Sequence, residues 1–277
     1  MAVFGKRRAL GQHFLRDRNI IEMISQTAVE EGRSHGCKAL LEIGPGRGAI
    51  THPLLEKLEA QHEIERFMLV EADRGLASDW REFAKKRELL KPTFSIEEGD
   101  FVQMPEEKWL TATPLAIASN LPYSAGTAIL TRLARHTAEI PVMVLMFQAE
   151  VAARLRAEPG TKAWGSLSIW LQNRWDVRKL CAAPPGAFAP PPDVNSEVVV
   201  LTRREAPRVN VPVDQEDFWN GLLKACFAHR RKMLRSGLDE GPYREALTHS
   251  GIEPTKRAEE LGWDEWVRFF AALKKLP

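Results

Sequence analysis

The sequence predicts an α/β fold, a Rossmann-like parallel sheet followed by a small helical domain. Three observations lead to this prediction. Short apolar segments typical of buried strands alternate with segments of helical spacing through the larger, N-terminal part of the 277 residues. A glycine-rich turn, Gly44–Gly48, lies directly between the first of these strands and a helical segment. Beyond Pro207 the chain has helical periodicity and no convincing strand.

The expected strands follow one another in a regular order. They cover Ala39–Ile43, Arg66–Val70, Thr93–Ile96, Leu115–Ser119, Pro141–Phe147 and Val198–Thr202. A helix is expected at Ala49–Leu58, after the glycine turn. Because helical segments separate the strands, the strands should run parallel, and such sheets bind ligands beyond the carboxyl ends of their strands. Glu71, Asp100 and Asn120 each end or follow a strand, so we expect them at that edge together with the glycine turn.

The C-terminal part of the chain is expected to form a separate helical domain. Pro207 and Pro212 mark a linker before it. Its expected helices are Asp214–Phe227, Tyr243–His249 and Trp263–Lys275. We therefore place a catalytic domain at residues 1–206, with an N-terminal arm at 1–18, and the helical domain at 207–277.

The composition is that of a soluble globular protein, with 44% hydrophobic and 27% charged residues. No apolar stretch approaches the roughly 18 residues of a membrane helix, and the N-terminus has no apolar signal region. A cytoplasmic protein without a membrane partner is expected. The three cysteines are widely spaced, which favours buried free thiols over disulfides or a zinc site, and no metal is expected. They are Cys37, Cys181 and Cys226.

The net charge is only +2, but basic residues gather in two places. The first cluster consists of Lys6, Arg7, Arg8, Arg16 and Arg18. The second consists of Lys224, Arg230, Arg231, Lys232 and Arg235, with no acidic residue between them. Either cluster alone is equally typical of a solvated helix face, but two of them flanking a methylase-like core favour RNA as the partner.

The glycine turn is better suited to S-adenosylmethionine than to a phosphate-rich ligand. It departs from the G-x-G-x-x-G dinucleotide fingerprint and lacks the Lys-Ser/Thr of a P-loop. Its pattern, Glu42 followed by alternating glycines, lets the backbone approach a ligand closely. Glu71 would then accept the two ribose hydroxyls, and Asp100 the amine of the adenine. Taken alone, Glu71 could be an acid near a helix N-terminus, and Asp100 is more typical of a turn.

Asn120-Leu121-Pro122-Tyr123 is the most informative segment for the chemistry. The amide oxygen of Asn120 and the carbonyl of Leu121 or Pro122 can accept the two N–H bonds of an amine. The Tyr123 ring offers a stacking face for a planar base. Asn and Pro are also common turn formers, so an ordinary turn stays open as an alternative.

Motifs in a fixed order along nearly the whole chain resemble those of the KsgA family, the small-subunit ribosomal RNA adenine dimethyltransferases. The motifs are Leu10–Leu15, Glu42–Gly46, Val70–Glu71, Gly99–Asp100, Asn120–Tyr123, Gln148–Val151, Phe188–Val194 and Phe227–Lys232. The resemblance implies a Rossmann-like class I S-adenosylmethionine-dependent methyltransferase sheet with a small C-terminal helical domain. It also implies dimethylation of two adjacent adenosines in a hairpin near the 3′ end of 16S rRNA, within a 30S-type particle during ribosome biogenesis. A monomer is expected for an enzyme that must dock on so large a particle.

The same resemblance implies roles for individual residues. Those implied to contact the donor are His13, Leu15, Gly44, Gly46, Glu71, Asp100 and Asn120. Those implied to act at the target base are Asn120, Leu121, Pro122, Tyr123 and Phe188, with Tyr123 and Phe188 on either side of the base. Those expected to bind RNA are Arg7, Arg8, Lys224, Arg230, Arg231 and Lys232. His13 stands where many bacterial members have Asn, so a contact through its backbone is the one that carries over.

Three alternatives stay open. An erythromycin-resistance methylase acting on large-subunit rRNA would share the arm and the glycine turn, but Leu121 and the triple proline Pro190–Pro192 favour the small-subunit family. A DNA adenine methylase would need a larger target-recognition region than the helical tail offers. A non-catalytic assembly or RNA-binding factor could use the same fold, although the complete set of glycines, Glu71, Asp100 and Asn120 argues against a loss of chemistry.

Overall fold

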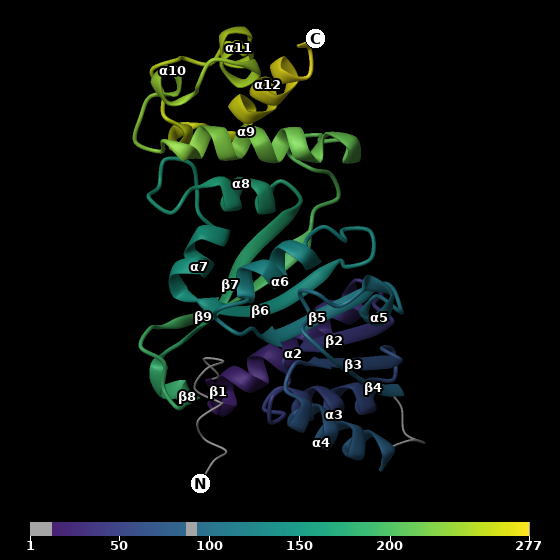
Figure 1. Ribbon diagram of the computed structural model, residues 1–277. Helices are drawn as coiled ribbons and strands as arrows, with labels where there is room; N and C mark the ends of the chain where they lie inside the picture. The colour runs from purple at the N-terminus through teal and green to yellow at the C-terminus, as the bar shows by residue number, and fades with distance from the viewer. Residues whose placement is uncertain (1–12, 87–92, 277) are drawn as a thin grey trace. The chain divides into compact units, whose positions relative to one another are not determined.

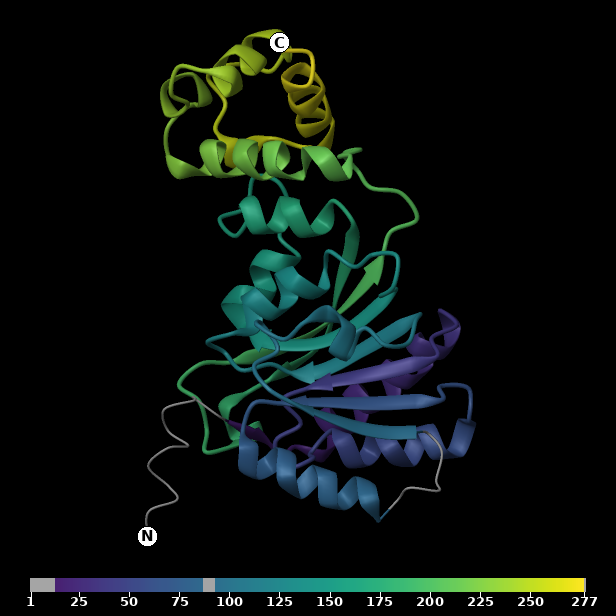
Figure 2. The same cartoon turned by 45° about the vertical axis from the view of Figure 1, so that its right-hand side comes forward.

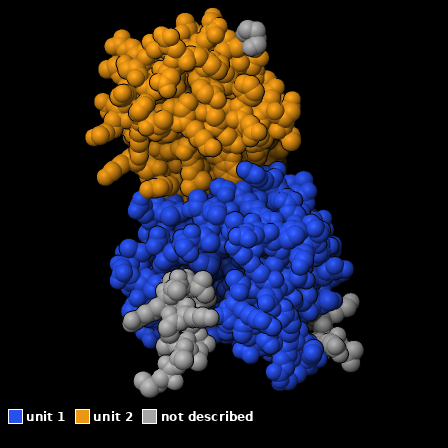
Figure 3. All heavy atoms as spheres, in the orientation of Figure 1, with its two compact units in different colours: residues 1–152, 177–203 blue, residues 153–176, 204–277 orange. Residues whose placement is uncertain are grey.

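The computed structural model describes residues 13–86 and 93–276. Arg7 and Arg8, two of the expected RNA-binding residues, lie outside the described residues. The chain divides into two compact units (Figure 3), one formed by residues up to 152 with 177–203, the other by 153–176 with the chain from 204 onward. A single boundary at 206 is therefore wrong for 153–176, which belong to the helical unit because their buried side chains join its core.

The larger unit is built around a seven-stranded sheet with the order β4-β3-β2-β5-β6-β9-β7 (Figure 1). The strands are β2 (Ala39–Ile43), β3 (Arg66–Glu71), β4 (Thr93–Glu98), β5 (Leu115–Asn120), β6 (Val142–Gln148), β7 (Trp175–Ala183) and β9 (Ser196–Arg203). The first five strands of that order pair in parallel, and β9 pairs with β6 in the antiparallel sense. The predicted parallel sheet is confirmed for these five strands, whereas the expected strand at Val198–Thr202, part of β9, runs antiparallel.

The burial of each strand follows from its place in the sheet. The central strands β2, β5 and β6 are almost continuously apolar and buried, as expected for parallel strands covered on both faces. The edge strand β4 alternates between exposed and half-buried positions. The other edge strand, β7, was not predicted, because its sequence carries charged and half-exposed residues that hide the strand pattern.

Helices cover both faces of this sheet. Those of the larger unit are α2 (Arg18–Ser34), α3 (Thr51–Gln61), α4 (Arg74–Lys85), α5 (Glu106–Trp109) and α6 (Gly126–Leu133). Helix α7 (Ala149–Leu155) begins in this unit and ends in the smaller one. Side chains of α2, α3 and α4 share one buried cluster with alternate residues of the strands. Helix α6 lies across the opposite face from α3 and α4 (Figure 2). Asp17 and Asp73 cap α2 and α4 by accepting backbone N–H bonds of the first turn.

Two short strands connect the N-terminal segment to a proline-rich loop at 184–193. β1 (Phe14–Leu15) pairs with β8 (Phe188–Ala189), which follows a 3-10 turn at Pro185–Ala187. The carbonyl of Ala187 also accepts the N–H of Arg16 at 2.8 Å. This pairing joins two segments of the larger unit that are far apart in the sequence. It brings the beginning of the described chain to the carboxyl edge of the sheet.

The smaller unit is helical, as predicted. Its elements are α8 (Ser166–Gln172), α9 (Glu216–Ala228), α10 (Leu234–Gly237), α11 (Pro242–His249) and α12 (Trp263–Leu273), with 3-10 turns at Val213–Gln215 and Ala258–Glu260. Trp164, Trp219 and Trp266 are fully buried in its core. Asn173 joins the two parts of this unit, because its side chain bonds the Val209 backbone at both N–H and carbonyl. Among the described residues, the structure contains no helix that is both long and apolar enough to cross a membrane.

Candidate active site at the carboxyl edge of the sheet

The glycine turn after β2 has a backbone that only glycine adopts readily. Gly44, Gly46 and Gly48 all have positive φ, at 68°, 56° and 85°. A Cβ on Gly46 would lie 3.1 Å from the Phe14 ring, and a Cβ on Gly48 would lie 2.7 Å from the Trp80 ring. A Cβ on Gly44 would meet nothing within 4 Å. The turn is therefore packed at two of its glycines and open at the third, which leaves room for a ligand at Gly44.

Glu71, the last residue of β3, holds this turn in place through hydrogen bonds. Its carboxylate oxygens accept the N–H of Gly46 at 3.0 Å and the N–H of Asp73 at 2.9 Å. The side chain is buried, and burial raises the pKa of Glu71, although the bonds from Asp73 and Gly46 work in the opposite direction. Each carboxylate oxygen has a second lone pair. The carboxylate can thus hold the turn and still accept hydroxyl groups of a ligand.

Glu42 is a second buried carboxyl group in the same place, and it was not predicted as a site residue. It is 2% exposed, and its Oε2 atom has no hydrogen-bond partner among the described residues. Burial, and to a lesser extent the charge of Glu71, raise the pKa of Glu42 to about 8. A hydrogen bond with the Thr51 side chain lowers this pKa, so the Thr51 hydroxyl is within reach of the carboxyl group. The sequence signal for Glu42 was the acidic residue that opens the glycine motif.

Asp100 lies in a turn and has an exposed side chain. Its Oδ1 atom accepts the N–H of Val102 at 2.9 Å, and its carbonyl accepts the N–H groups of Gln103 and Met104. Asp100 is therefore a turn residue. Its side chain is exposed just beyond the end of β4, next to the strand that ends at Glu71, so the carboxylate is also accessible to a ligand at this edge.

Asn120 ends β5 and contacts the N-terminal segment. Its Nδ2 atom donates to the carbonyl of His13 at 3.3 Å, which sets the orientation of the amide. The Pro122 carbonyl accepts the N–H groups of Ala125 and Gly126 at 3.1 and 2.8 Å, where α6 begins. Of the two carbonyls considered as a second acceptor, the one of Pro122 is therefore engaged in the helix.

Tyr123 joins this segment to β9. Its hydroxyl lies 2.6 Å from the Ser196 hydroxyl, and burial raises the pKa of Tyr123. The ring is half-buried, and the His13 ring lies against it with centroids 5.5 Å apart. The His13 Nδ1 atom in turn lies 2.9 Å from the carbonyl of Pro190. The tetrapeptide, the N-terminal segment and the proline-rich loop therefore form one connected group.

The Phe188 ring does not fit the place implied for it, and the Leu15 side chain is buried beside it. Phe188 is 1% exposed and Leu15 is 4% exposed, and they are paired across the β1–β8 ladder. Both belong to the core that α2 covers. In this conformation the Phe188 ring has no free face for a base, so its expected place in a sandwich with Tyr123 is wrong here. The physical reason is the β1–β8 pairing, which directs this ring into the core.

The basic residues of the smaller unit fall into two groups. Lys224, Arg231 and Lys232 are exposed. Arg230 instead donates to Glu259 at 2.7 Å and to the carbonyl of Lys162. The guanidinium of Arg230 is therefore already engaged within the helical unit, which distinguishes it from the other three residues.

The cysteines and the acidic residues of the described chain show no metal centre. Cys37 and Cys226 are buried free thiols, and burial raises the pKa of Cys37 to about 12. Cys181 is free and half-buried. Among residues 13–86 and 93–276, no three His, Cys, Asp or Glu side chains are grouped so that they could hold a metal ion.

The fold is similar to that of two solved methyltransferases. A dimethyladenosine transferase from Plasmodium falciparum superimposes with a TM-score of 0.74 at 22% identity, covering 95% of this chain and 98% of that one. The 23S rRNA methyltransferase ErmE superimposes with a TM-score of 0.67 at 23% identity, covering 95% and 100%. These similarities show the class I methyltransferase fold, since identities this low carry no more than the fold.

Sequence comparisons are more specific. The chain is 37% identical to the ribosomal RNA small subunit methyltransferase A of Alcanivorax borkumensis over 94% of this chain and 88% of that protein. It is also 37% identical to the protein of the same name in Xanthomonas oryzae pv. oryzae, over 95% and 94%. The family model described as ribosomal RNA adenine dimethylase matches residues 3–275. The chain therefore belongs to the ribosomal RNA adenine dimethylase family.

Proposed function

We propose that this protein transfers methyl groups from S-adenosylmethionine to the N6 amines of two adjacent adenosines in small-subunit rRNA. The observation that carries the proposal is the position of Asn120. It ends β5 at the carboxyl edge of the sheet, where β2 leads into the open glycine turn and β3 ends in Glu71. An amide acceptor for an amine thus lies at the same edge as a site that fits a ribose and a compact cationic ligand.

The residues around the glycine turn fit the methyl donor. The open space at Gly44 admits it, Glu71 accepts its ribose hydroxyls, and Asp100 accepts its adenine amine. When bound, S-adenosylmethionine supplies a methyl group activated by a positively charged sulfur.

The protein's own contribution is to orient the amine. The Nδ2 atom of Asn120 is held by the His13 carbonyl, so its Oδ1 atom is left to accept one N–H of the target amine. Because the Pro122 carbonyl is engaged at the start of α6, we assign the second acceptor to the carbonyl of Leu121. Two acceptors on one amine favour a more tetrahedral nitrogen whose lone pair points away from them. Alignment then supplies most of the rate, and the proton can leave to solvent without a strong base.

The target base must leave its stack to reach this edge. Unstacking takes a few kcal/mol, which stacking and phosphate contacts offset. The half-buried Tyr123 ring offers the stacking face. We propose that the exposed Lys224, Arg231 and Lys232 of the helical unit bind phosphates, together with Arg7 and Arg8 of the arm.

The proposal is tested with tritiated S-adenosylmethionine and three substrates: under-methylated 30S particles, 23S rRNA and DNA. We expect label in small-subunit rRNA, and dimethyladenosine as the nucleoside after digestion. Label only in 23S rRNA would favour the erythromycin-resistance type of activity, and label only in DNA would favour a DNA methylase. No label in any substrate, while the protein still binds 30S particles, would favour a non-catalytic assembly factor.

A further inference from the structure

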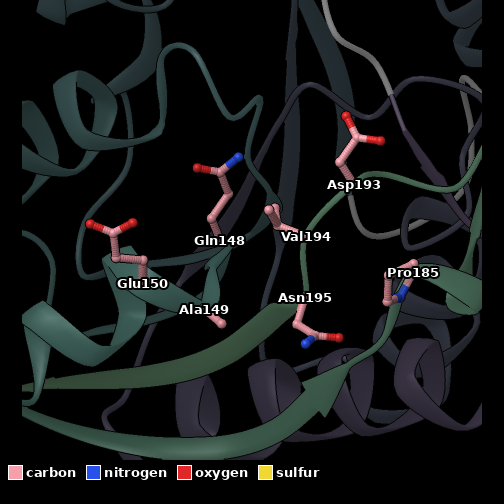
Figure 4. A pocket seen from close by; sticks show the side chains of 7 residues that line it. All are labelled: Gln148, Ala149, Glu150, Pro185, Asp193, Val194 and Asn195. Carbon is pink, nitrogen blue, oxygen red and sulfur yellow. The ribbon is translucent and has the colours of Figure 1, made fainter.

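A cavity of about 350 Å³ opens beside the proposed site in the larger unit. It is lined by Gln148, Ala149, Glu150, Pro185, Asp193, Val194 and Asn195. Figure 4 shows that Gln148, Glu150 and Asp193 extend toward the same side of the view, with Val194 between Gln148 and Asp193. The roles proposed above use none of these residues.

The cavity is connected to the tetrapeptide through β9. Asn195 in its wall directly precedes Ser196, whose hydroxyl bonds the Tyr123 hydroxyl at 2.6 Å. Gln148 lies opposite Ser196 in the β6–β9 ladder. The N–H of Ala149 donates to the Asn195 carbonyl at 2.9 Å. The hydrogen bond to Tyr123 and the wall of the cavity therefore both involve residues at the place where β6 ends and β9 begins.

The chemistry of the lining selects against phosphate and for an amine. One exposed carboxylate, Asp193, and two amides, Gln148 and Asn195, provide oxygen acceptors, and the lining includes no Lys or Arg. A phosphate would be repelled by the Asp193 carboxylate, whereas an exocyclic amine presents an N–H donor to it. Val194, 44% exposed, adds an apolar surface on which a planar ring can lie.

We propose that this cavity receives the nucleobase next to the one being methylated, namely the second adenosine of the pair, and binds it through its exocyclic amine. The inference rests on the proposed function. Bases in single-stranded loops are commonly splayed apart and bound one by one. While the first adenosine lies against Tyr123, its neighbour is one backbone step away and reaches the adjacent cavity. Asp193 acts here as a residue that positions the RNA.

The proposal has a consequence for the order of methylation. An unmethylated adenosine has two N–H donors on N6, and a dimethylated one has none. The acceptors in the cavity therefore favour RNA whose neighbouring adenosine is still unmodified. Once both methyl groups are on the neighbour, the cavity loses its hydrogen bonds to that base, and RNA binding weakens.

The test uses RNA hairpins in which one adenosine of the pair is replaced. Purine riboside lacks the exocyclic amine and cannot itself be methylated, so transfer reports only the remaining adenosine. The wild-type protein is assayed with both hairpins that carry one replaced adenosine. Even for the one with the lower KM, we expect a KM about tenfold above that of the unsubstituted hairpin, which is the effect of losing one charge-assisted hydrogen bond. Dimethyladenosine at the same position should act like purine riboside.

The protein variant is Asp193→Ala, and its matched control is Asp79→Ala, which removes an exposed carboxylate from α4. We expect Asp193→Ala to raise the KM for unsubstituted RNA about tenfold with little change in kcat or in donor affinity. The purine substitution should have little further effect on this variant, because both changes remove the same contact. Asp79→Ala should behave as the wild type.

Two results would overturn the proposal. One is a wild-type KM that does not respond to the loss of the neighbouring amine at either position. The other is a purine substitution that raises the KM of Asp193→Ala by the same factor as the KM of the wild type, because independent effects mean separate contacts. Failure of the proposed function looks different, because the wild-type protein would then transfer no label to any adenosine of the unsubstituted hairpin or the 30S particle.

Discussion

Glu71 is the residue whose replacement tests the donor site most sharply. It is 3% exposed, and each of its oxygens accepts one backbone N–H, from Gly46 and from Asp73. Glu71→Gln keeps the shape of the side chain and replaces one oxygen by an NH2 group. The amide can then accept only one of the two backbone N–H bonds, and it can accept fewer ligand hydroxyls.

The expected magnitudes differ for folding and for binding. A buried N–H left facing an NH2 group costs about 1–3 kcal/mol. Burial raises the pKa of Glu71, which means that the buried charge is itself unfavourable, and its removal offsets part of this loss. The net fall in unfolding free energy should therefore be small. A hydroxyl bond to a carboxylate contributes about 1.5–3 kcal/mol, so losing one should weaken donor binding about 10- to 150-fold.

Calorimetric titration with S-adenosylmethionine measures the donor affinity, and urea denaturation measures the stability. The matched control is Glu98→Gln, because Glu98 lies opposite Glu71 in the β3–β4 ladder but pairs with Arg81 at 2.8 Å. We expect the control to bind the donor nearly as the wild type does. A donor analogue without one ribose hydroxyl should bind the wild type more weakly than S-adenosylmethionine does. The difference in affinity between the wild type and Glu71→Gln should be smaller for this analogue than for S-adenosylmethionine.

A Glu71→Gln protein that is folded and binds the donor with wild-type affinity would refute this reasoning. So would an equal loss in Glu98→Gln, because the effect would then come from the net charge at the sheet edge and not from the hydrogen bonds of Glu71.

Three further predictions follow from charge and burial. Because the pKa of Glu42 is raised to about 8, the folded state holds a proton that the unfolded state releases, and stability should fall as pH rises from about 5 to about 8; Glu42→Gln should remove this part of the pH dependence in urea titrations. The Cys181 thiol, half-buried with its pKa raised by burial, should react with N-ethylmaleimide before the two buried thiols, and mass spectrometry of partly labelled protein shows whether it does. Arg231→Glu should weaken rRNA binding and reduce its salt slope by about one while leaving stability unchanged, whereas Arg230→Glu should lower stability by about 1–2 kcal/mol because it breaks the pair with Glu259.

The sequence was sufficient to predict six of the seven strands of the sheet and the residues at their carboxyl ends. Strands β2, β5 and β6 are nearly continuous apolar runs, a pattern typical of parallel strands that are buried on both faces. The glycine turn, Glu71 and Asn120 each follow a strand, so strand direction alone brought them together. These patterns depend only on residues that are close together in the sequence, so they can be recognised without knowing the contacts between distant segments.

The features that were missed depend on contacts between distant segments. The burial of Phe188 follows from its pairing with Leu15, which no periodicity reveals. Arg230 is engaged by Glu259 across the helical unit, so a basic run in the sequence overstated the positive surface. Helix α8 joined the smaller unit through packing, although it precedes the linker in sequence.

The measurement that tests the central claim most directly is single-turnover methyl transfer by Asn120→Ala to under-methylated 30S particles. Donor affinity is measured in parallel by calorimetry, and Asn19→Ala, an exposed position on α2, serves as the control. If Asn120 orients the target amine, transfer should fall by at least about a hundredfold, the scale of losing an oriented polar contact in the reacting complex, while the donor still binds measurably. Transfer at the wild-type rate by Asn120→Ala would contradict the assignment of this edge as the site of the chemistry.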